Sequence, residues 1–189
     1  MLKSTMFTYD QAHKLLEQYI QNQNLRKHCY AVESCMRFYA RKLNQQNEID
    51  WAVAGLLHDI DWELYPDTHP ITAVPILQEA GVSQEIIDAI LGHAYPSRTD
   101  VQRQSLMAKY LFACDELSGF IVAYALMKPG RLKDIDGYGV AKKLKEKAFA
   151  RNVSREDIET GLTEIGLDIV THANNLIEAM QADTRLGLD

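Results

Sequence analysis

The sequence predicts an all-α protein, and three observations lead to that fold class. Apolar residues recur at three- and four-residue steps over most of the chain, which is the spacing of one face of an α-helix. No stretch has the strict apolar–polar alternation of a half-buried β-strand. Proline and glycine divide the apolar runs into segments of helical length. Because 47% of the 189 residues are hydrophobic, we expect one helical bundle with a sizeable core.

Two helices are expected first, over residues 8–23 and 24–43. Thr8 and Asn24 suit their N-termini, because such side chains accept hydrogen bonds from the free backbone N–H groups there. His28 lies on the apolar stripe of the second helix, at helical spacing from its apolar neighbours. We therefore expect the His28 imidazole to face the interior of the bundle.

Residues 49–60 are apolar on nearly every side, which predicts a central and fully buried helix. Gly55 in its middle costs about 1 kcal/mol relative to alanine, so we expect another helix to approach closely there. The run ends in His58 and Asp59. A buried carboxylate needs a partner, and a metal ion is one partner that both side chains can bind.

Two shorter helices are predicted after a loop rich in acidic residues. The first covers residues 69–80, with Pro70 at a favourable first position and Pro75 expected to kink or shorten it. The second begins after Ser83, which can cap it, and carries His93 near its C-terminus, before a Tyr-Pro break. Histidines therefore stand at the start of one helix and at the end of the next.

A long helix is predicted over residues 101–127, with Asp115 beside its buried side. Pro129 and Gly130 form a strong break after it, and the composition changes beyond this break. We therefore predict a main helical domain at 1–128 and a C-terminal helical extension at 129–189 that packs on it.

The extension is predicted to contain a basic helix over residues 140–150 and a final helix over 154–182, weakened around Gly161 and Gly166, with a frayed tail. The basic helix carries four lysines: Lys142, Lys143, Lys145 and Lys147. They are interpreted as a solvated charged face, or alternatively as point charges that meet a substrate phosphate.

Composition narrows the class of partner. The net charge of −6 and the pI near 5.5 argue against a protein that binds nucleic-acid polymers, which is usually basic. The three cysteines lie in apolar helical contexts and are interpreted as buried thiols, which suits a reducing cytosol: Cys29, Cys35 and Cys114. No signal-peptide pattern and no membrane-spanning segment are found in the sequence, so a cytoplasmic protein without membrane contact is expected.

Six side chains with metal-binding chemistry stand on inward stripes or at helix ends: His28, His58, Asp59, His69, His93 and Asp115. Their separations exceed one local loop, so helix packing must bring them together. Six mixed nitrogen and oxygen ligands exceed the four of a tetrahedral zinc site. They suit two octahedral ions that share a carboxylate, with Fe or Mn favoured and Mg, Ni, Co or Zn as alternatives. Two such ions can activate a water and hold a phosphoryl group.

The order His, His-Asp, His, His, Asp resembles the HD-domain (HDIG-type) metal-dependent phosphohydrolases in their binuclear form. The resemblance covers residues 25–126 and implies an HD-type helical bundle. It implies one ion held by His28, His58, Asp59 and Asp115. It further implies that Asp59, as the catalytic residue, bridges to a second ion held by His69 and His93. The implied activity is cleavage of a nucleotide or other small phosphate ester by a water that two metal ions activate.

Two positions depart from that family pattern. Many relatives have glycine and lysine where this chain has Asp61 and Trp62. Asp61 is interpreted as a cap of the helix end, or alternatively as a general acid or hydrogen-bond acceptor near the metals. The charge of the missing lysine could come from Arg131, Lys142 or Lys143.

Three other functions stay open at this point. The chain could be a regulatory module that binds metal and a ligand without turnover. It could be a binuclear iron oxygenase, because some HD-fold proteins cleave C–C or C–P bonds with oxygen. It could also be a helical scaffold whose histidines are only packed. Under the favoured interpretation the partner is a small phosphorylated molecule.

Overall fold

The computed structural model of the protein describes residues 7–188. All regular structure in this range is helical, which confirms the predicted all-α class. No helix in the range has both the length and the apolar character that a membrane crossing needs. The α-helices are α1 (Tyr9–Tyr19), α2 (Gln23–Lys42), α3 (Glu48–Leu57), α4 (Ala73–Ala80), α5 (Gln84–His93), α6 (Leu106–Ala125), α7 (Gly137–Leu144), α8 (Arg155–Ile165) and α9 (Ile169–Gln181). Two short 3-10 helices are η1 (Arg131–Asp134) and η2 (Thr184–Leu186).

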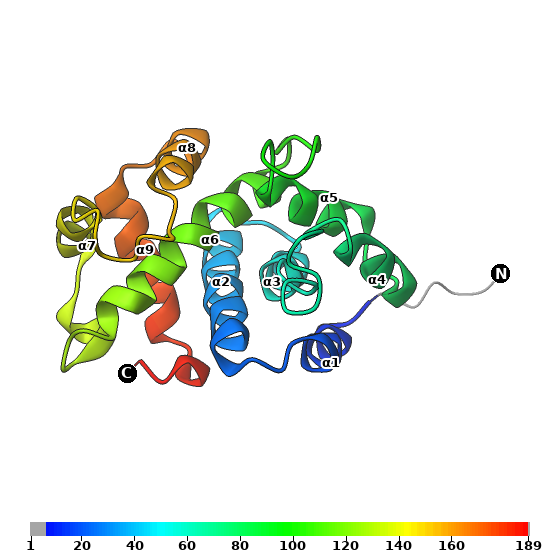
Figure 1. The fold of residues 1–189 in the computed structure, drawn as a ribbon, viewed down its shortest axis with the longest axis horizontal. Coiled ribbons are helices and arrows are strands. Elements are labelled where there is room, and N and C mark those ends of the chain that lie inside the picture. Colours follow the sequence, from blue (N-terminus) through cyan, green and yellow to red (C-terminus); the bar gives the residue numbers. More distant parts are fainter. Residues whose placement is uncertain (1–6, 189) are drawn as a thin grey trace.

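Helix α6 runs across the middle of the molecule (Figure 1). In this view α4 and α5 lie on the right-hand side of the molecule, and α7 and α8 lie on the left-hand side. Helix α6 packs against α2, α5 and α8, so it contacts segments that are far apart in the sequence. A side chain on α6 can therefore share a site with residues that are distant in sequence.

Helix α3 is buried as its sequence predicts, because every residue from Trp51 to Leu57 is buried. Its most extensive contact is with α2. A Cβ atom at Gly55 would lie 2.8 Å from the Cα of Glu33 and 3.0 Å from the Cγ of Met36. Only glycine permits this approach of the two helices, which confirms the explanation predicted for Gly55.

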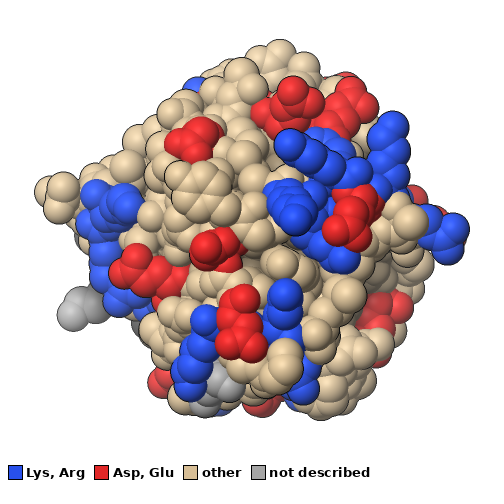
Figure 2. Space-filling model, turned by 90° about the vertical axis from the view of Figure 1, so that its left-hand side faces the viewer, with Lys and Arg blue, Asp and Glu red and all other residues tan. Residues whose placement is uncertain are grey.

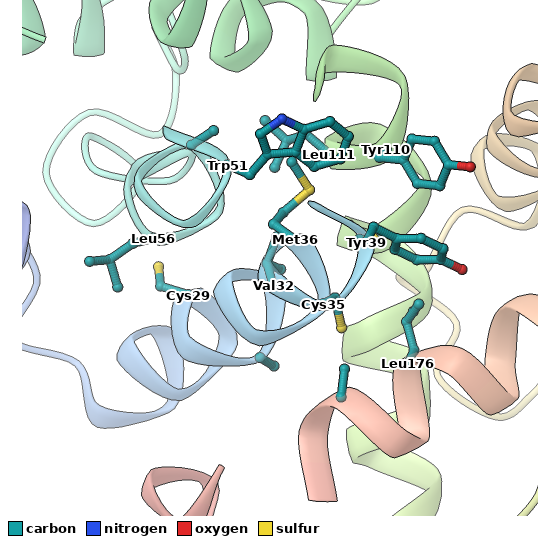
Figure 3. Packing of buried hydrophobic residues seen from close by; sticks show 14 of the residues in the cluster. Cys29, Val32, Cys35, Met36, Tyr39, Trp51, Leu56, Tyr110, Leu111 and Leu176 are labelled. Carbon is teal, nitrogen blue, oxygen red and sulfur yellow. The ribbon is translucent and has the colours of Figure 1, made fainter. Parts of the chain in front are cut away.

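One hydrophobic cluster joins α2, α3, α6 and α9 (Figure 3). The rings of Trp51 in α3 and Tyr110 in α6 have centroids 5.8 Å apart, and Tyr110 lies 4.5 Å from Tyr39 of α2 by the same measure. Leu176 brings α9 into the same cluster. The cysteines are free and buried, as predicted: Cys29, Cys35 and Cys114.

Helix α4 begins later than predicted. It starts at Ala73 and not at Pro70, because the residues before it form turns. The carboxylate of Asp61 accepts a hydrogen bond of 2.9 Å from the backbone N–H of Ala73. Pro75 then falls in the first turn, where a backbone N–H has no acceptor within the helix. Helix α4 lacks the predicted residues before Ala73, which agrees with the shortening expected from Pro75, and it continues past Pro75 to Ala80.

Helix α6 is also shorter than the predicted 101–127. Ser105 caps it, with its hydroxyl oxygen accepting a hydrogen bond of 3.1 Å from the N–H of Ala108. The preceding residues, 99–104, have no regular secondary structure, and Arg103 donates hydrogen bonds to the carbonyls of Gly92 and Tyr95 at and just after the C-terminal end of α5.

The C-terminal extension contains more breaks than predicted. The basic helix, α7, begins after Asp136, whose side chain caps it, and ends at Leu144 rather than at residue 150. The helix predicted over 154–182 is divided into α8 and α9. Gly166 has a φ of +68° at the division, a conformation that glycine adopts without the strain of a Cβ atom.

The described C-terminal residues, up to Leu188, are packed against the core, so the predicted fraying of the tail is wrong for them. Leu186 and Leu188 are buried in the main hydrophobic cluster, and η2 packs against α2. Ile158 of α8 and Met180 of α9 belong to the same cluster. The predicted division into 1–128 and 129–189 stays a prediction, while the described parts of both segments share one core.

Candidate metal centre

The six predicted ligands come from five separate places in the fold. His28 lies on α2, His58 and Asp59 directly follow α3, and Asp115 lies on α6. His69 lies four positions before the first residue of α4, and His93 is the last residue of α5. The structure brings all six together, in two groups of three whose ligand atoms lie within 4.8 Å of one another.

The first group consists of His28, His58 and Asp115. The Nε2 atom of His28 lies 2.9 Å from Oδ1 of Asp115 and 3.1 Å from Nε2 of His58. The Nε2 atom of His58 lies 3.4 Å from the same Asp115 oxygen. These three atoms therefore form a small triangle at the contact between α2, α3 and α6.

The second group consists of Asp59, His69 and His93. The Nε2 atoms of His69 and His93 are 3.1 Å apart. Oδ1 of Asp59 lies 3.5 Å from Nε2 of His69. This triangle lies at the contact between the α3–α4 connection and the end of α5.

Asp59 connects the two groups. Its Oδ2 atom lies 3.5 Å from Nε2 of His58 and 3.7 Å from Nε2 of His28, which belong to the first group. Its other oxygen faces His69 of the second group. One carboxylate thus presents one oxygen to each group, which is the arrangement of a bridging ligand.

The hydrogen bonds of the second group show that these residues fit a cation. Nδ1 of His69 donates to Asp61 at 2.7 Å, and Nδ1 of His93 donates to the carbonyl of Ile90. A neutral imidazole carries one N–H, so each Nε2 has a lone pair directed at the other. Two lone pairs 3.1 Å apart repel unless a proton or a metal ion lies between them. Ligands bound to one ion at 2.1 Å would lie about 3.0–3.4 Å apart, as these atoms do.

The pKa shifts of His58 and His93 also indicate that these residues can bind a cation. Burial lowers the pKa of His93 to about 4, so its ring is neutral at pH 7 and able to ligate a metal. Burial also opposes protonation of His58, but the carboxylates of Asp59 and Asp115 outweigh it and raise the pKa of His58 to about 9. The first group therefore stabilises positive charge at Nε2 of His58, where a metal ion can replace the proton.

A family model for the HD domain matches residues 25–119, which is half of the chain. The chain belongs to the HD domain family. This HD domain thus carries the histidine and aspartate pattern of a superfamily of metal-dependent phosphohydrolases. Searches of curated proteins and of solved structures found no match.

In this HD domain Asp61 is a hydrogen-bond acceptor behind the metal ligands. Its side chain is fully buried. One oxygen accepts from Nδ1 of His69, and the other accepts from the backbone N–H of Ala73. The favoured interpretation of Asp61 as a cap at the end of its own helix is therefore wrong. Asp61 orients the ring of His69 and accepts a hydrogen bond from a free backbone N–H at the N-terminus of α4.

The HD domain has a cavity of about 390 Å³ over the two ligand groups. Arg98 is the only lysine or arginine that lines it among residues 7–188, and Glu116 and Asp157 add acidic groups to its wall. Burial, followed by the neighbouring Asp115 carboxylate, raises the pKa of Glu116 to about 7. Asp157 and Val153 show that the C-terminal extension forms part of the wall.

The basic residues considered as substitutes for the missing lysine lie elsewhere. Lys142 and Lys143 line a separate pocket next to Tyr124, and Arg131 donates a hydrogen bond to the carbonyl of Leu126. Figure 2 views the end of the molecule that carries α7 and α8, and basic and acidic side chains are intermixed there. This agrees with the solvated charged face interpreted from the sequence.

Arg103 supports the histidine of α5 and was not recognised in the sequence. Its Nη1 donates to the carbonyls of Gly92 and Tyr95, on either side of His93. Its Nε and Nη2 donate to the carboxylate of Glu164 on α8. No local pattern distinguishes Arg103 from a surface arginine, since all of its partners are brought to it by packing.

Proposed function

We propose that this HD domain is a metal-dependent phosphohydrolase that cleaves a nucleotide or other small phosphate ester. The observation that carries the proposal is the position of Asp59, which faces both ligand groups inside one cavity. Two groups joined by a carboxylate suit a pair of ions, and a pair of ions can hold both the attacking and the leaving oxygen of a phosphoryl displacement.

The ligand sets differ in composition. His28, His58 and Asp115 would hold one ion, His69 and His93 would hold the other, and Asp59 would contribute an oxygen to each. Nitrogen and oxygen donors without cysteine favour Fe or Mn. When bound, such ions supply positive charge to phosphoryl oxygens and lower the pKa of a coordinated water.

The chain itself orients the ligands. Nδ1 of His58 donates to the carbonyl of Gly55 at 2.8 Å, and the corresponding atoms of His69 and His93 donate to Asp61 and to a backbone carbonyl. These bonds fix each ring and leave Nε2 directed at the site. The ligand geometry is therefore set before any ion binds.

The charges of the cavity favour an anionic substrate only when cations are present. Without ions, the carboxylates of Asp59, Asp115 and Asp157 outnumber the single guanidinium of Arg98. Bound divalent ions reverse this balance and make the cavity attractive to a phosphate. A cavity of about 390 Å³ suits a small ester rather than a polymer.

The test is a screen of phosphorylated metabolites with Mn²⁺ or Fe²⁺ added, beside elemental analysis of the purified protein. We expect the wild-type protein to release inorganic phosphate from at least one ester and to approach two ions per chain. Asp59→Ala should lose both the hydrolysis and most of the bound metal. Asp67→Ala, an exposed position on the loop before His69, is the matched control and should retain both.

Other outcomes would contradict the proposal in distinguishable ways. Oxygen consumption without phosphate release would identify an oxygenase. A protein that binds metal through Asp59 and hydrolyses no ester would be a ligand-binding module. A protein that binds no metal would be a helical scaffold with packed histidines.

A further inference from the structure

Arg98 differs from the other charged residues that line the cavity, because it is basic and they are acidic. It follows α5 in the connection to α6 and lines the cavity together with His69 and His93. The metal-ligand candidates in the same cavity are imidazoles and carboxylates. Arg98 is therefore the one permanent positive charge that the described chain places beside them.

The guanidinium is held in place from two sides. Its Nη1 donates to the carbonyl of Pro66 at 2.8 Å and to the carbonyl of His69 at 3.3 Å. Its central carbon lies 5.5 Å from the ring centroid of Trp62, within the range of a cation–π contact. The Trp62 ring in turn meets the ring of His69 edge-on, with centroids 4.9 Å apart. Arg98 is thus positioned relative to a metal ligand.

Part of the guanidinium is left for another partner. The Nε and Nη2 atoms of Arg98 make no hydrogen bond, and the side chain makes no ion pair, with any residue of 7–188. The carboxylates of Asp59 and Asp115 line the same cavity and do not neutralise it. The side chain is exposed, so a ligand in the cavity can reach it without displacing the protein.

We propose that Arg98 binds the anionic phosphoryl group of the substrate, with Trp62 and the carbonyls of Pro66 and His69 holding its guanidinium ready. Two adjacent N–H groups of arginine match two oxygens of a phosphate. Arg98 would act beside the metal ions, as a substrate-binding residue that supplies charge from the protein. This inference rests on the proposed function for the identity of the anion.

The experiment measures binding of inorganic phosphate to the Mn²⁺-loaded protein by calorimetry, with metal content measured on every sample. Arg98→Gln should weaken phosphate binding about 10- to 100-fold, the size expected for one charge-assisted contact. Its metal content should stay at the wild-type value. Arg98→Lys should recover part of the affinity, because the positive charge returns without the two-pronged geometry.

Arg41→Gln is the matched control. Arg41 is exposed at the C-terminal end of α2 and lies 3.9 Å from Glu48 as its only ion-pair partner in the described chain. The substitution removes the same charge from the protein and should leave phosphate binding unchanged. An equal loss of affinity in this control would mean that net charge, and not Arg98, sets the affinity, which would overturn the inference.

Three further results would overturn it. Arg98→Gln could bind phosphate as the wild type does, Arg98→Gln could lose its metal, or Arg98→Lys could recover nothing. Either of the last two results would show that Arg98 has a structural role, in which it stabilises the loop that carries His69. Failure of the proposed function is distinguishable, because it would show as Arg98-dependent phosphate binding without hydrolysis of any ester.

Discussion

Each of the buried histidines at the site is fixed through its Nδ1 atom, and this decides where its other nitrogen points. His58 and His93 donate to backbone carbonyls of their own helices, which any sequence could offer. His69 is different, because it lies outside a helix and donates to the side chain of Asp61. A buried carboxylate also makes the imidazole a more basic ligand. Asp61 is therefore the residue whose loss should affect one ligand group only.

Asp61→Asn is predicted to weaken the metal bound by His69 and His93 about 10- to 100-fold, because outer contacts of this kind tune metal affinity by that factor. The metal at His28, His58 and Asp115 should be unaffected. Competition with a chelator during Mn²⁺ titration measures both affinities. Asp67→Asn, in the same loop but exposed, is the control, and an equal effect on both sites in Asp61→Asn would contradict the prediction.

His172 is a buried histidine that is remote from the metal ligands in sequence and has a structural role. Its Nδ1 accepts a hydrogen bond of 2.5 Å from the hydroxyl of Tyr39, and its Nε2 donates to the carbonyl of Ala113 at 3.0 Å. Both nitrogens are satisfied in the neutral form, and burial lowers the pKa of His172 to about 4. Protonation of Nδ1 would remove the lone pair that accepts from Tyr39, so the hydrogen bond that joins α9 to α2 exists only while His172 is uncharged.

Acidification is predicted to weaken the fold through His172. The folded pKa near 4 lies below the unfolded value near 6.5, so the unfolded chain binds more protons between these values and stability falls as the pH falls from 6.5 to 4. The total loss corresponds to about 3 kcal/mol. Urea unfolding of metal-free protein at pH 7 and pH 5 measures it. In His172→Gln the free energy of unfolding should differ less between pH 7 and pH 5 than in the wild type. An identical difference in the two proteins would contradict the prediction.

At the scale of elements, the contact between α2 and α3 positions most of the first ligand group. Helix α2 carries His28 and helix α3 leads directly to His58 and Asp59. The two helices approach so closely at Gly55 that no side chain fits between them. Small changes in this contact would therefore shift the ligands relative to one another.

Gly55→Ala is predicted to destabilise the protein by about 1–3 kcal/mol, because the added methyl group would overlap the backbone of Glu33. This outweighs the gain of about 1 kcal/mol from the higher helix propensity of alanine. Chemical denaturation gives the free energy of unfolding. Gly119→Ala in α6 is the matched comparison, since a Cβ there meets its nearest neighbour at an ordinary 3.9 Å, and it should be neutral or stabilising. Stabilisation by Gly55→Ala would show that the helices can separate freely.

At the scale of the whole molecule, the C-terminal extension completes both the core and the cavity. Leu176 and Met180 of α9 are buried with residues of α2 and α6, and a Cβ at Gly161 of α8 would lie 2.9 Å from the Cα of Ala113. Val153 and Asp157 line the cavity. The HD match ends at residue 119, yet the described structure continues to build the site beyond it.

A chain ending at residue 128 is predicted to lose cooperative folding. Each large apolar side chain of α9 that is removed from the core costs about 1.5–3 kcal/mol, and a single domain is stable by only about 5–15 kcal/mol. Circular dichroism during thermal unfolding should show a broad or absent transition for residues 1–128. A sharp transition with metal affinity equal to that of the whole chain would instead establish an independent N-terminal domain.

Much of this protein follows from local sequence. The apolar stripe around His28 predicts its inward direction, and the apolar run before His58 predicts the buried α3. These features depend on residues within one or two helical turns, so periodicity and residue type are sufficient to identify them. The six potential metal ligands are identified in the same way, by their chemistry and by their places on predicted helices.

Tertiary structure alone decides how these residues are used. The family resemblance implies the division into two groups and the position of Asp59 between them, but no local pattern does, because both depend on how α2, α5 and α6 pack around α3. The partners of Asp61, Arg98 and Arg103 become neighbours only when distant segments meet. Local patterns carry no record of those contacts, because packing free energy depends on which surfaces face each other and not on their separation along the chain.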